Sequence, residues 1–227
     1  MSVLANIAKI EERIQKACYS AGRKREEITL MGVSKFVPIS RVEEAQKAGI
    51  CYFGESRVQE ATEKFEAVRP FKLHMIGSLQ RNKAKIAAGF FNCIQSVDRL
   101  ELITELAKHT ANREKPLEVL LELHTGEESK SGFADFDILL KAAEILFSVK
   151  NIKPAGLMTM APFTDDHALV RSSFRQLVKA QNELEKRFPS GESGNWNCLS
   201  MGMSNDFEVA IEEGSTMLRI GSLIFKE

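Results

Sequence analysis

The sequence has no excess of charge of either sign, because its 227 residues include 31 Lys and Arg and 31 Asp and Glu. General binding to nucleic acid or to an anionic membrane surface needs a basic excess, so this balance argues against both partners. The chain also has no uninterrupted apolar run of about 18 residues, the minimum for a helix that spans a bilayer. Residues 1–13 are helical in pattern and mixed in charge, unlike a secretory signal or a transit peptide.

Cysteine is scarce and scattered. The four cysteines form no Cys-x-x-Cys pair and no zinc-binding spacing. They lie at Cys18, Cys51, Cys93 and Cys198. Reduced thiols of a cytoplasmic protein account for this distribution, and we predict no metal site.

What the sequence does contain is a regular alternation of short apolar runs and amphipathic segments. We predict strands at 28–35, 50–53, 71–76, 93–97, 117–123, 153–158, 197–200 and 216–220. We predict helices between them at 40–48, 55–68, 79–88, 98–110, 135–148, 165–188 and 206–213, with Ser40 and Asp98 as caps. A further helix at about 1–21 precedes them, with isoleucines at helical spacing and an end at Gly22.

Strand–helix units in this number, joined by short connections, close most naturally into a single (β/α)8 (TIM) barrel. A doubly wound open sheet is the competing architecture. We predict one domain over residues 1–227, with the N-terminal helix as an addition. In a barrel the carboxyl ends of the strands share one mouth, so residues far apart in sequence meet there.

The first predicted strand ends on Lys35. A short apolar run with a charged stretch before it and Pro38 after it is typical of a strand buried on both faces. A lysine at the carboxyl end of such a strand lies at the rim of the core, where partial desolvation lowers its pKa and favours imine formation. The alternative is a rim lysine that extends into water.

Two other strand ends are suited to an anion. The run 200–204, Ser-Met-Gly-Met-Ser, follows a strand and leads into a helix, where backbone N–H groups and hydroxyls suit a phosphate. Arg219 ends the eighth strand beside Gly221, and Asp206 is better suited to capping a helix than to contacting an anion. The alternatives are plain turn chemistry and an ion pair of the arginine. Together with Lys35, these residues describe a site for an aldehyde that carries a phosphate.

Seven motifs spread over the whole chain form a recognisable set: Val33-Ser34-Lys35, the runs 53–60 and 74–83, Ser96-Val97-Asp98, Lys130-Ser131-Gly132, Gly156-Leu157-Met158 and the run 199–225. In these motifs the chain resembles the pyridoxal phosphate homeostasis proteins. The resemblance implies a barrel like the N-terminal domain of alanine racemases that holds pyridoxal 5′-phosphate (PLP) as a Schiff base on Lys35. It also implies that Arg219 lies near the pyridine nitrogen. The positions implied to hold the phosphate are Ser200, Gly202, Met203, Gly221 and Ser222.

The resemblance implies a carrier rather than an efficient enzyme. An arginine does not give up its proton, so Arg219 does not keep the pyridine nitrogen protonated, and PLP becomes a poorer electron sink. Family members lack the second domain that supplies a catalytic tyrosine in racemases, and neither Tyr19 nor Tyr52 falls at a predicted strand end. We therefore predict a cytoplasmic, monomeric protein that buffers PLP and delivers it to PLP-dependent apo-enzymes, with no nucleic acid or membrane as partner.

Several positions depart from the family pattern. Ser56 stands where Asn is usual, Leu73 where Trp is usual and His124 where Asn is common, while the run 225–227 lacks an expected glycine and arginine. We expect Ser56 to contact the cofactor.

Two other functions stay open. One is an amino-acid racemase, and the other is an esterase with a Ser56–His124 dyad, although no Gly-x-Ser-x-Gly elbow is present. The basic residues Lys72, Arg81, Lys83 and Lys85 are interpreted as a solvated face.

Overall fold

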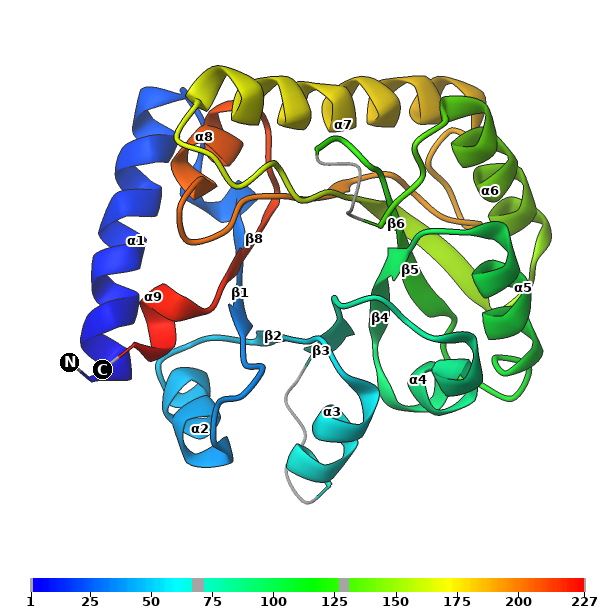
Figure 1. Cartoon of the computed structure of the whole chain (residues 1–227), viewed down its shortest axis with the longest axis horizontal. Helices are drawn as coiled ribbons and strands as arrows, with labels where there is room; N and C mark the ends of the chain where they lie inside the picture. The colour runs from blue at the N-terminus through cyan, green and yellow to red at the C-terminus, as the bar shows by residue number, and fades with distance from the viewer. Residues whose placement is uncertain (1, 67–71, 127–130, 227) are drawn as a thin grey trace.

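The computed structural model describes residues 2–66, 72–126 and 131–226. Within them, eight parallel strands form a closed barrel in the order β1 to β8, and β8 pairs with β1 (Figure 1). The strands are β1 Thr29–Val33, β2 Tyr52–Glu55, β3 Lys72–Met75, β4 Cys93–Val97, β5 Leu117–Glu122, β6 Ile152–Met158, β7 Cys198–Ser200 and β8 Met217–Ile220. The predicted (β/α)8 barrel is confirmed, and the open sheet is excluded.

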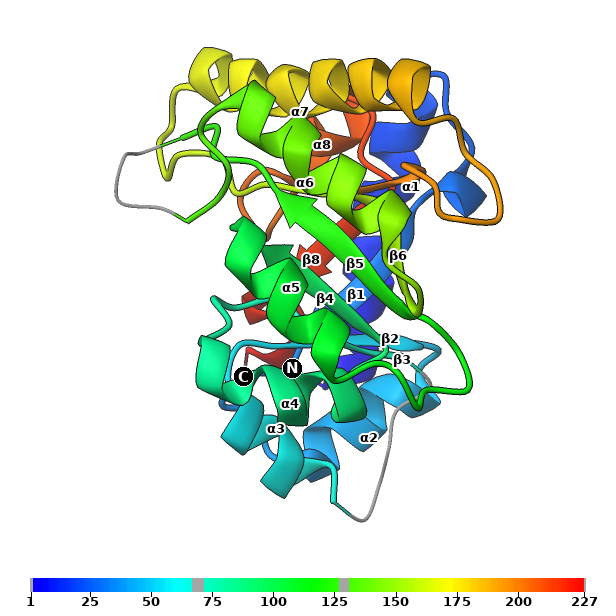
Figure 2. The same cartoon turned by 90° about the vertical axis from the view of Figure 1, so that its right-hand side faces the viewer.

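Helices form an outer ring around the strands, as the two views in Figures 1 and 2 show. They are α1 Val3–Ser20, α2 Ile39–Lys47, α3 Val58–Lys64, α4 Ala84–Phe90, α5 Leu100–Lys108, α6 Phe136–Ser148, α7 His167–Arg187, α8 Phe207–Glu212 and α9 Ser222–Phe225. Two short 3₁₀ turns, η1 Arg25–Glu27 and η2 Arg81–Lys83, complete the set. α1 packs against α8 and α9, which brings the two ends of the chain together.

The core consists of one large cluster, which joins residues of the strands and the helices, and a small separate cluster of Cys93, Leu120 and Met158. In α1, Ile7, Ile10 and Ile14 recur at helical spacing and are buried, as their pattern predicts. Burial of each such side chain contributes about 2 kcal/mol to the free energy of unfolding. Asn6 on the same helix donates hydrogen bonds from Nδ2 to the carbonyls of Ile224 (3.0 Å) and Lys226 (2.9 Å), so α1 also fixes the end of the chain.

The predicted ends of several elements are wrong by a few residues. β1 ends at Val33 rather than at Lys35, because Phe36 adopts a left-handed conformation (φ 61°) and Pro38 has no N–H for a ladder bond. Neither predicted cap acts as one. Pro38 occupies the cap position of α2 in place of Ser40, and Asp98 bonds to the Arg99 guanidinium instead of to an N–H of α5.

Other boundaries shift as well. β2 begins at Tyr52 and ends at Glu55, two residues later than expected, and the helix predicted at 79–88 is split into η2 and α4. The predicted helix end at Val68, the predicted strand start at Phe71 and the motif residue Lys130 lie outside the described residues.

Within the described ranges, no helix is both long and apolar enough to cross a bilayer. The same residues contain no group of three or more His, Cys, Asp or Glu side chains placed to hold a metal ion. All four cysteines are free thiols, and Cys51 is exposed. The cytoplasmic location inferred from them stays a prediction.

Candidate functional site

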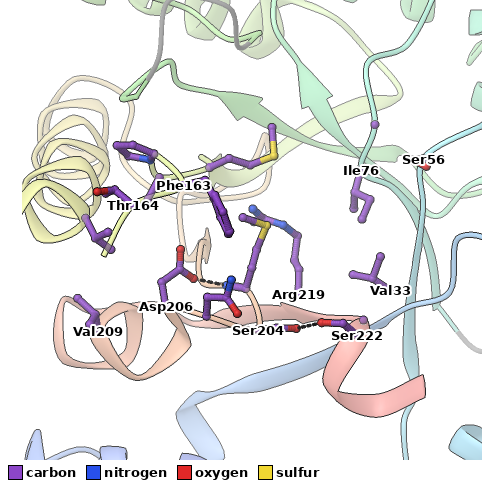
Figure 3. A pocket seen from close by; sticks show the side chains of 18 of the residues that line it. Val33, Ser56, Ile76, Phe163, Thr164, Ser204, Asp206, Val209, Arg219 and Ser222 are labelled. Carbon is purple, nitrogen blue, oxygen red and sulfur yellow. Dashed lines mark hydrogen bonds between the residues drawn. The ribbon is translucent and has the colours of Figure 1, made fainter. Parts of the chain in front are cut away.

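The carboxyl ends of the strands surround a cavity of about 640 Å³, a volume in the usual range for a small-molecule site. Its walls come from the loops that follow β1, β2, β3, β6, β7 and β8 and from the end of β5. In Figure 3, Arg219 lies between the loops after β6 and β1, with Phe163 on one side and Val33 on the other. The cavity therefore occupies the position where barrels of this kind place their sites.

Most of the predicted site residues line this cavity. Those on its wall are Lys35, Ser56, Met203, Arg219, Gly221 and Ser222. The structure thus brings together six residues from the two halves of the chain, as the barrel geometry predicts. Ser200 and Gly202 are not on the wall.

Ser200 is fully buried and its hydroxyl is already engaged. Its Oγ donates to Oε1 of Gln95 (2.7 Å) and accepts from Nη1 of Arg219 (2.8 Å). The predicted contact between this hydroxyl and a phosphate stays a prediction, since both hydrogen bonds of the hydroxyl in this structure join it to protein side chains. The hydroxyl helps to hold Arg219.

Gly202 is needed for close packing, and its predicted part in holding a phosphate stays a prediction. Its φ is 98°, and a Cβ at this position would lie 2.6 Å from Cβ of Ala210 and 2.9 Å from Cδ2 of Leu218. The glycine therefore lets the loop after β7 approach α8 and β8 closely. Its carbonyl accepts a hydrogen bond from the backbone N–H of Arg219 (2.9 Å).

The loops after β7 and β8 meet at a pair of hydroxyls. Oγ of Ser222 donates to Oγ of Ser204 at 2.9 Å, and both residues line the cavity (Figure 3). Asp206 fixes the same turn, because its Oδ1 accepts from the backbone N–H of Met203 (2.5 Å). Asp206 stands at the cap position of α8 but makes no side-chain capping bond there. The expectation that it caps the helix through its carboxylate is wrong.

Arg219 is held rigidly at the cavity floor, with only 4% of its surface exposed. Nη1 donates to the carbonyl of Ser200 (2.6 Å) and to its Oγ, and Nη2 donates to the carbonyl of Thr159 (2.8 Å). Burial lowers the pKa of the guanidinium from its ordinary value, although arginine stays charged in proteins. The cavity floor is therefore positive.

Buried polar residues continue below Arg219 into the barrel. Gln95 accepts from Ser200 and donates from Nε2 toward Nδ1 of His74 (2.8 Å). Desolvation lowers the pKa of His74 to about 3, so the imidazole is neutral and Nδ1 accepts. We call Arg219, Ser200, Gln95 and His74 the polar column.

Glu122, at the end of β5, is a site residue that sequence reasoning missed. It is 1% exposed and lines the cavity, with Oε1 accepting from Oγ of Ser131 (2.7 Å). Its Oε2 has no partner among the described residues, and burial raises the pKa of the carboxyl. Its signal in the sequence was a single acid within the otherwise apolar run 119–123.

Lys35 lies two residues beyond the end of β1 and lines the cavity. Its side chain is exposed, so the prediction of a partly desolvated amine at the rim of the core is wrong. The reason is the early end of β1, which moves the lysine from the strand into a turn. The residue nonetheless lines the same cavity as Arg219.

The predicted Ser56–His124 pair is not assembled at the cavity. Ser56 lines the wall, whereas His124 does not and is fixed by a backbone hydrogen bond to Phe133 (3.0 Å). Tyr19 is exposed and Tyr52 packs edge-on against His74, and neither lines the cavity. The structure therefore gives no support to ester hydrolysis by this pair.

The family model described as alanine racemase, N-terminal domain, matches residues 5–227. A pyridoxal phosphate homeostasis protein of Aquifex aeolicus (strain VF5) is 39% identical over 100% of this chain and 99% of its own length. The protein of the same name from Escherichia coli (strain K12) is 36% identical, over 97% and 94%. This chain belongs to the pyridoxal phosphate homeostasis protein family. The resemblance read from the sequence motifs is thereby confirmed.

Solved structures agree with this membership. PipY of Synechococcus elongatus PCC7942, with PLP bound, has a TM-score of 0.84 and 28% identity over 99% of this chain and 100% of that chain. An alanine racemase from E. faecalis has a TM-score of 0.73 at 17% identity and shares the fold. This chain covers 59% of that racemase, so the likeness concerns its barrel-sized part.

Proposed function

We propose that this protein binds PLP in the cavity at the barrel mouth, holds it as a Schiff base on Lys35 and so buffers or delivers the cofactor. The observation that carries the proposal is that one cavity is lined by Lys35, by Arg219 and by the Ser204–Ser222 pair. The relatives named for PLP homeostasis and PipY with PLP bound support it.

The residues of the cavity fit the chemistry of this ligand. An exposed primary amine is the group that attacks an aldehyde carbon, forming a C=N bond while the aldehyde oxygen leaves as water. Two hydroxyls and a fixed guanidinium suit a phosphate and the lone pair of a ring nitrogen, and the unpartnered Oε2 of Glu122 is available for a further polar contact. PLP, when bound, supplies the aldehyde and an electron-withdrawing ring.

The same residues favour retention over turnover. Both Nη atoms of Arg219 already donate to protein oxygens, so the floor of the site orients a ligand and does not move protons. No tyrosine lines the described part of the cavity, which leaves a racemase without its usual opposing acid or base. We therefore propose a carrier role in the cytoplasm, as a monomer, with PLP-dependent apo-enzymes as recipients.

A visible spectrum tests the proposal. Purified protein mixed with PLP is expected to show an imine absorbance band that borohydride bleaches, and Lys35→Ala is expected to lose the band completely. Lys85→Ala, which removes an exposed lysine of α4, is the matched control and keeps it. A band of full strength in Lys35→Ala would show that another amine holds the ligand. Racemisation of alanine well above the rate with PLP alone would overturn the carrier role.

A further inference from the structure

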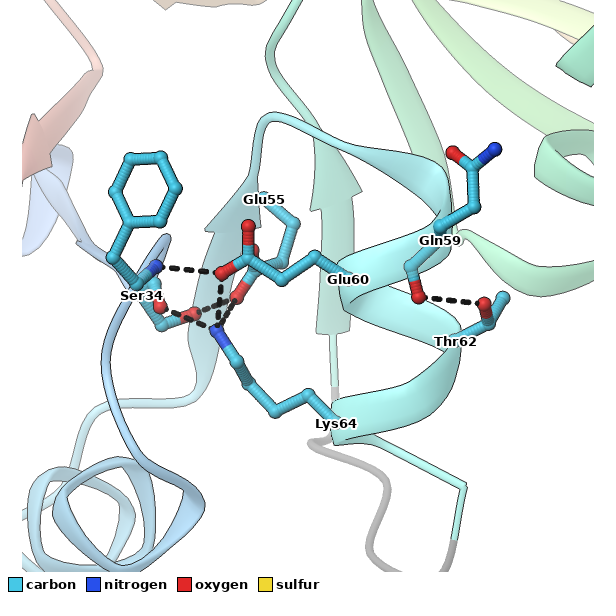
Figure 4. A network of polar contacts seen from close by, with 7 residues as sticks. Ser34, Glu55, Gln59, Glu60, Thr62 and Lys64 are labelled. Atoms are coloured by element: carbon cyan, nitrogen blue, oxygen red, sulfur yellow. Dashed lines mark hydrogen bonds and ion pairs between the residues drawn. The ribbon is translucent and has the colours of Figure 1, made fainter.

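The turn that carries Lys35 is held by a cluster of charged residues reaching from β2 and α3, which Figure 4 shows. Glu55, the last residue of β2, is fully buried. Its Oε1 accepts from Oγ of Ser34 (2.7 Å) and from Nζ of Lys64 (2.9 Å). We call Ser34, Glu55, Glu60 and Lys64 the Lys64 cluster.

Lys64 uses its whole hydrogen-bonding capacity inside this cluster. Besides Glu55, its Nζ donates to the carbonyl of Ser34 (2.6 Å) and to Oε1 of Glu60 (3.2 Å). An ammonium has three N–H donors, and these three bonds engage all of them. Lys64 is therefore held as a structural cation with 10% of its side chain exposed, and its amine is not a competitor for an aldehyde.

Glu60 closes the cluster on the other side of Lys35. Its Oε1 accepts from the backbone N–H of Phe36 (2.6 Å). Phe36 has a φ of 61°, a conformation that costs a residue with a side chain on the order of 1 kcal/mol and persists only where its surroundings impose it. Both neighbours of Lys35 are thus fixed, Ser34 through its side chain and carbonyl and Phe36 through its N–H.

Fixing the backbone matters because the Lys35 side chain is exposed and has four rotatable bonds. The direction in which the chain leaves the turn then decides how often the amine faces the cavity. Holding reacting groups near one another raises their effective concentration and hence the rate of bond formation.

We propose that Lys64 and Glu60 are positioning residues, which hold the 34–36 turn so that the Lys35 amine faces the cavity and attaches to its ligand quickly and fully. The inference rests on the proposed function. It assigns a purpose to a buried lysine and a strained turn that binding of the ligand itself does not require.

The test compares Lys64→Met, Glu60→Ala and Glu60→Gln with wild type. Lys186→Met, which breaks an exposed ion pair with Glu183 on α7, is the control. Three quantities are measured: hydrogen exchange of the Phe36 amide without PLP, the dissociation constant for pyridoxine 5′-phosphate, which has no aldehyde, and the rate of appearance of the imine band with PLP.

Loss of the charge-assisted bonds is expected to speed Phe36 exchange and to slow attachment, each about tenfold in Lys64→Met. Affinity for pyridoxine 5′-phosphate is expected to stay within about twofold, because this ligand does not need the amine. Glu60→Gln keeps an acceptor oxygen for Phe36 and is expected to be milder than Glu60→Ala. This ranking tests the inference even if Lys64→Met fails to fold.

Two results would overturn the inference. The first is an unchanged rate of attachment in Lys64→Met and Glu60→Ala although the Phe36 amide exchanges faster, and the second is an unchanged rate of Phe36 exchange. Equal loss in Glu60→Gln and Glu60→Ala would also count against it. Wild-type protein that binds pyridoxine 5′-phosphate but never forms the band with PLP would instead overturn the proposed function, so the two failures are distinguishable.

Discussion

Lys35 and Arg219 line the same cavity, but the structure holds these two cations in opposite ways. The lysine is exposed, and what is fixed is its backbone, through Ser34 and Phe36. The arginine is buried, and what is fixed is its guanidinium, through bonds to Ser200 and Thr159. A group that must form and release a covalent bond needs mobility, whereas a group that orients a ligand works best when its position is preset.

The comparison predicts a large loss of stability on removing Arg219 and almost none on removing Lys35, and this is the largest difference that we expect. Arg219→Ala removes the donors to Oγ of Ser200 and to the carbonyl of Thr159, and one of the two donors to the carbonyl of Ser200. The change is expected to lower the free energy of unfolding by about 3 kcal/mol. Lys35→Ala, at an exposed turn, is expected to change it by less than about 0.5 kcal/mol. Urea denaturation of both variants measures these values, and similar losses in the two would break the comparison.

The polar column below Arg219 makes a second prediction, on pH. His74 has a folded-state pKa of about 3, below the value in the unfolded chain, so acid protonates the unfolded state first. Stability is therefore expected to fall as the pH drops below about 6.5, by about 1.4 kcal/mol per pH unit, until the folded pKa is reached.

His74→Gln isolates this effect, because the variant keeps a side-chain oxygen that can accept from Gln95. The difference in unfolding free energy between wild type and His74→Gln is expected to shift by about 2 kcal/mol between pH 7 and pH 5, in favour of the variant at low pH. Chemical denaturation across this range measures it. A difference that does not change with pH would show that the column tolerates a charged histidine.

A smaller effect sharpens the comparison between the end of β7 and the start of α9. Ser200→Ala removes one bond each to Gln95 and Arg219 and is expected to cost about 1 kcal/mol of stability. Ser222 lines the cavity. Removing its hydroxyl in Ser222→Ala is expected to cost little stability and to weaken pyridoxine 5′-phosphate binding several-fold instead. The reverse assignment of the two effects would favour Ser200 as the phosphate contact.

Much of this arrangement was predictable because the barrel follows from apolar periodicity and short connections. Once eight strand–helix units close, their strands' carboxyl ends share one mouth, and this geometry predicts that Lys35 and Arg219 lie at the same site. Side-chain direction was not predictable in the same way. A shift of one residue in a strand turns a side chain from one face to the other, so the buried orientation of Ser200 could not be derived from its motif.

The Lys64 cluster shows a second limit. Lys64 and Glu60 lie four residues apart on α3, a spacing that fits an ordinary surface pair. Their bonds to Ser34 and Phe36 cross from α3 to the loop after β1, and nothing local in the sequence signals such a contact. The role of Glu122 was predictable, because an acid in a buried apolar strand is rare and indicates a site residue.

The most direct test of the account is to find the residue that carries the ligand. The protein is loaded with PLP and treated with borohydride, which supplies the hydride that turns the C=N bond into a stable C–N bond. It is then digested and analysed by mass spectrometry. The account predicts one modified peptide, with the added mass on Lys35. Modification on Lys64 or another lysine, or no modification at all, would contradict it.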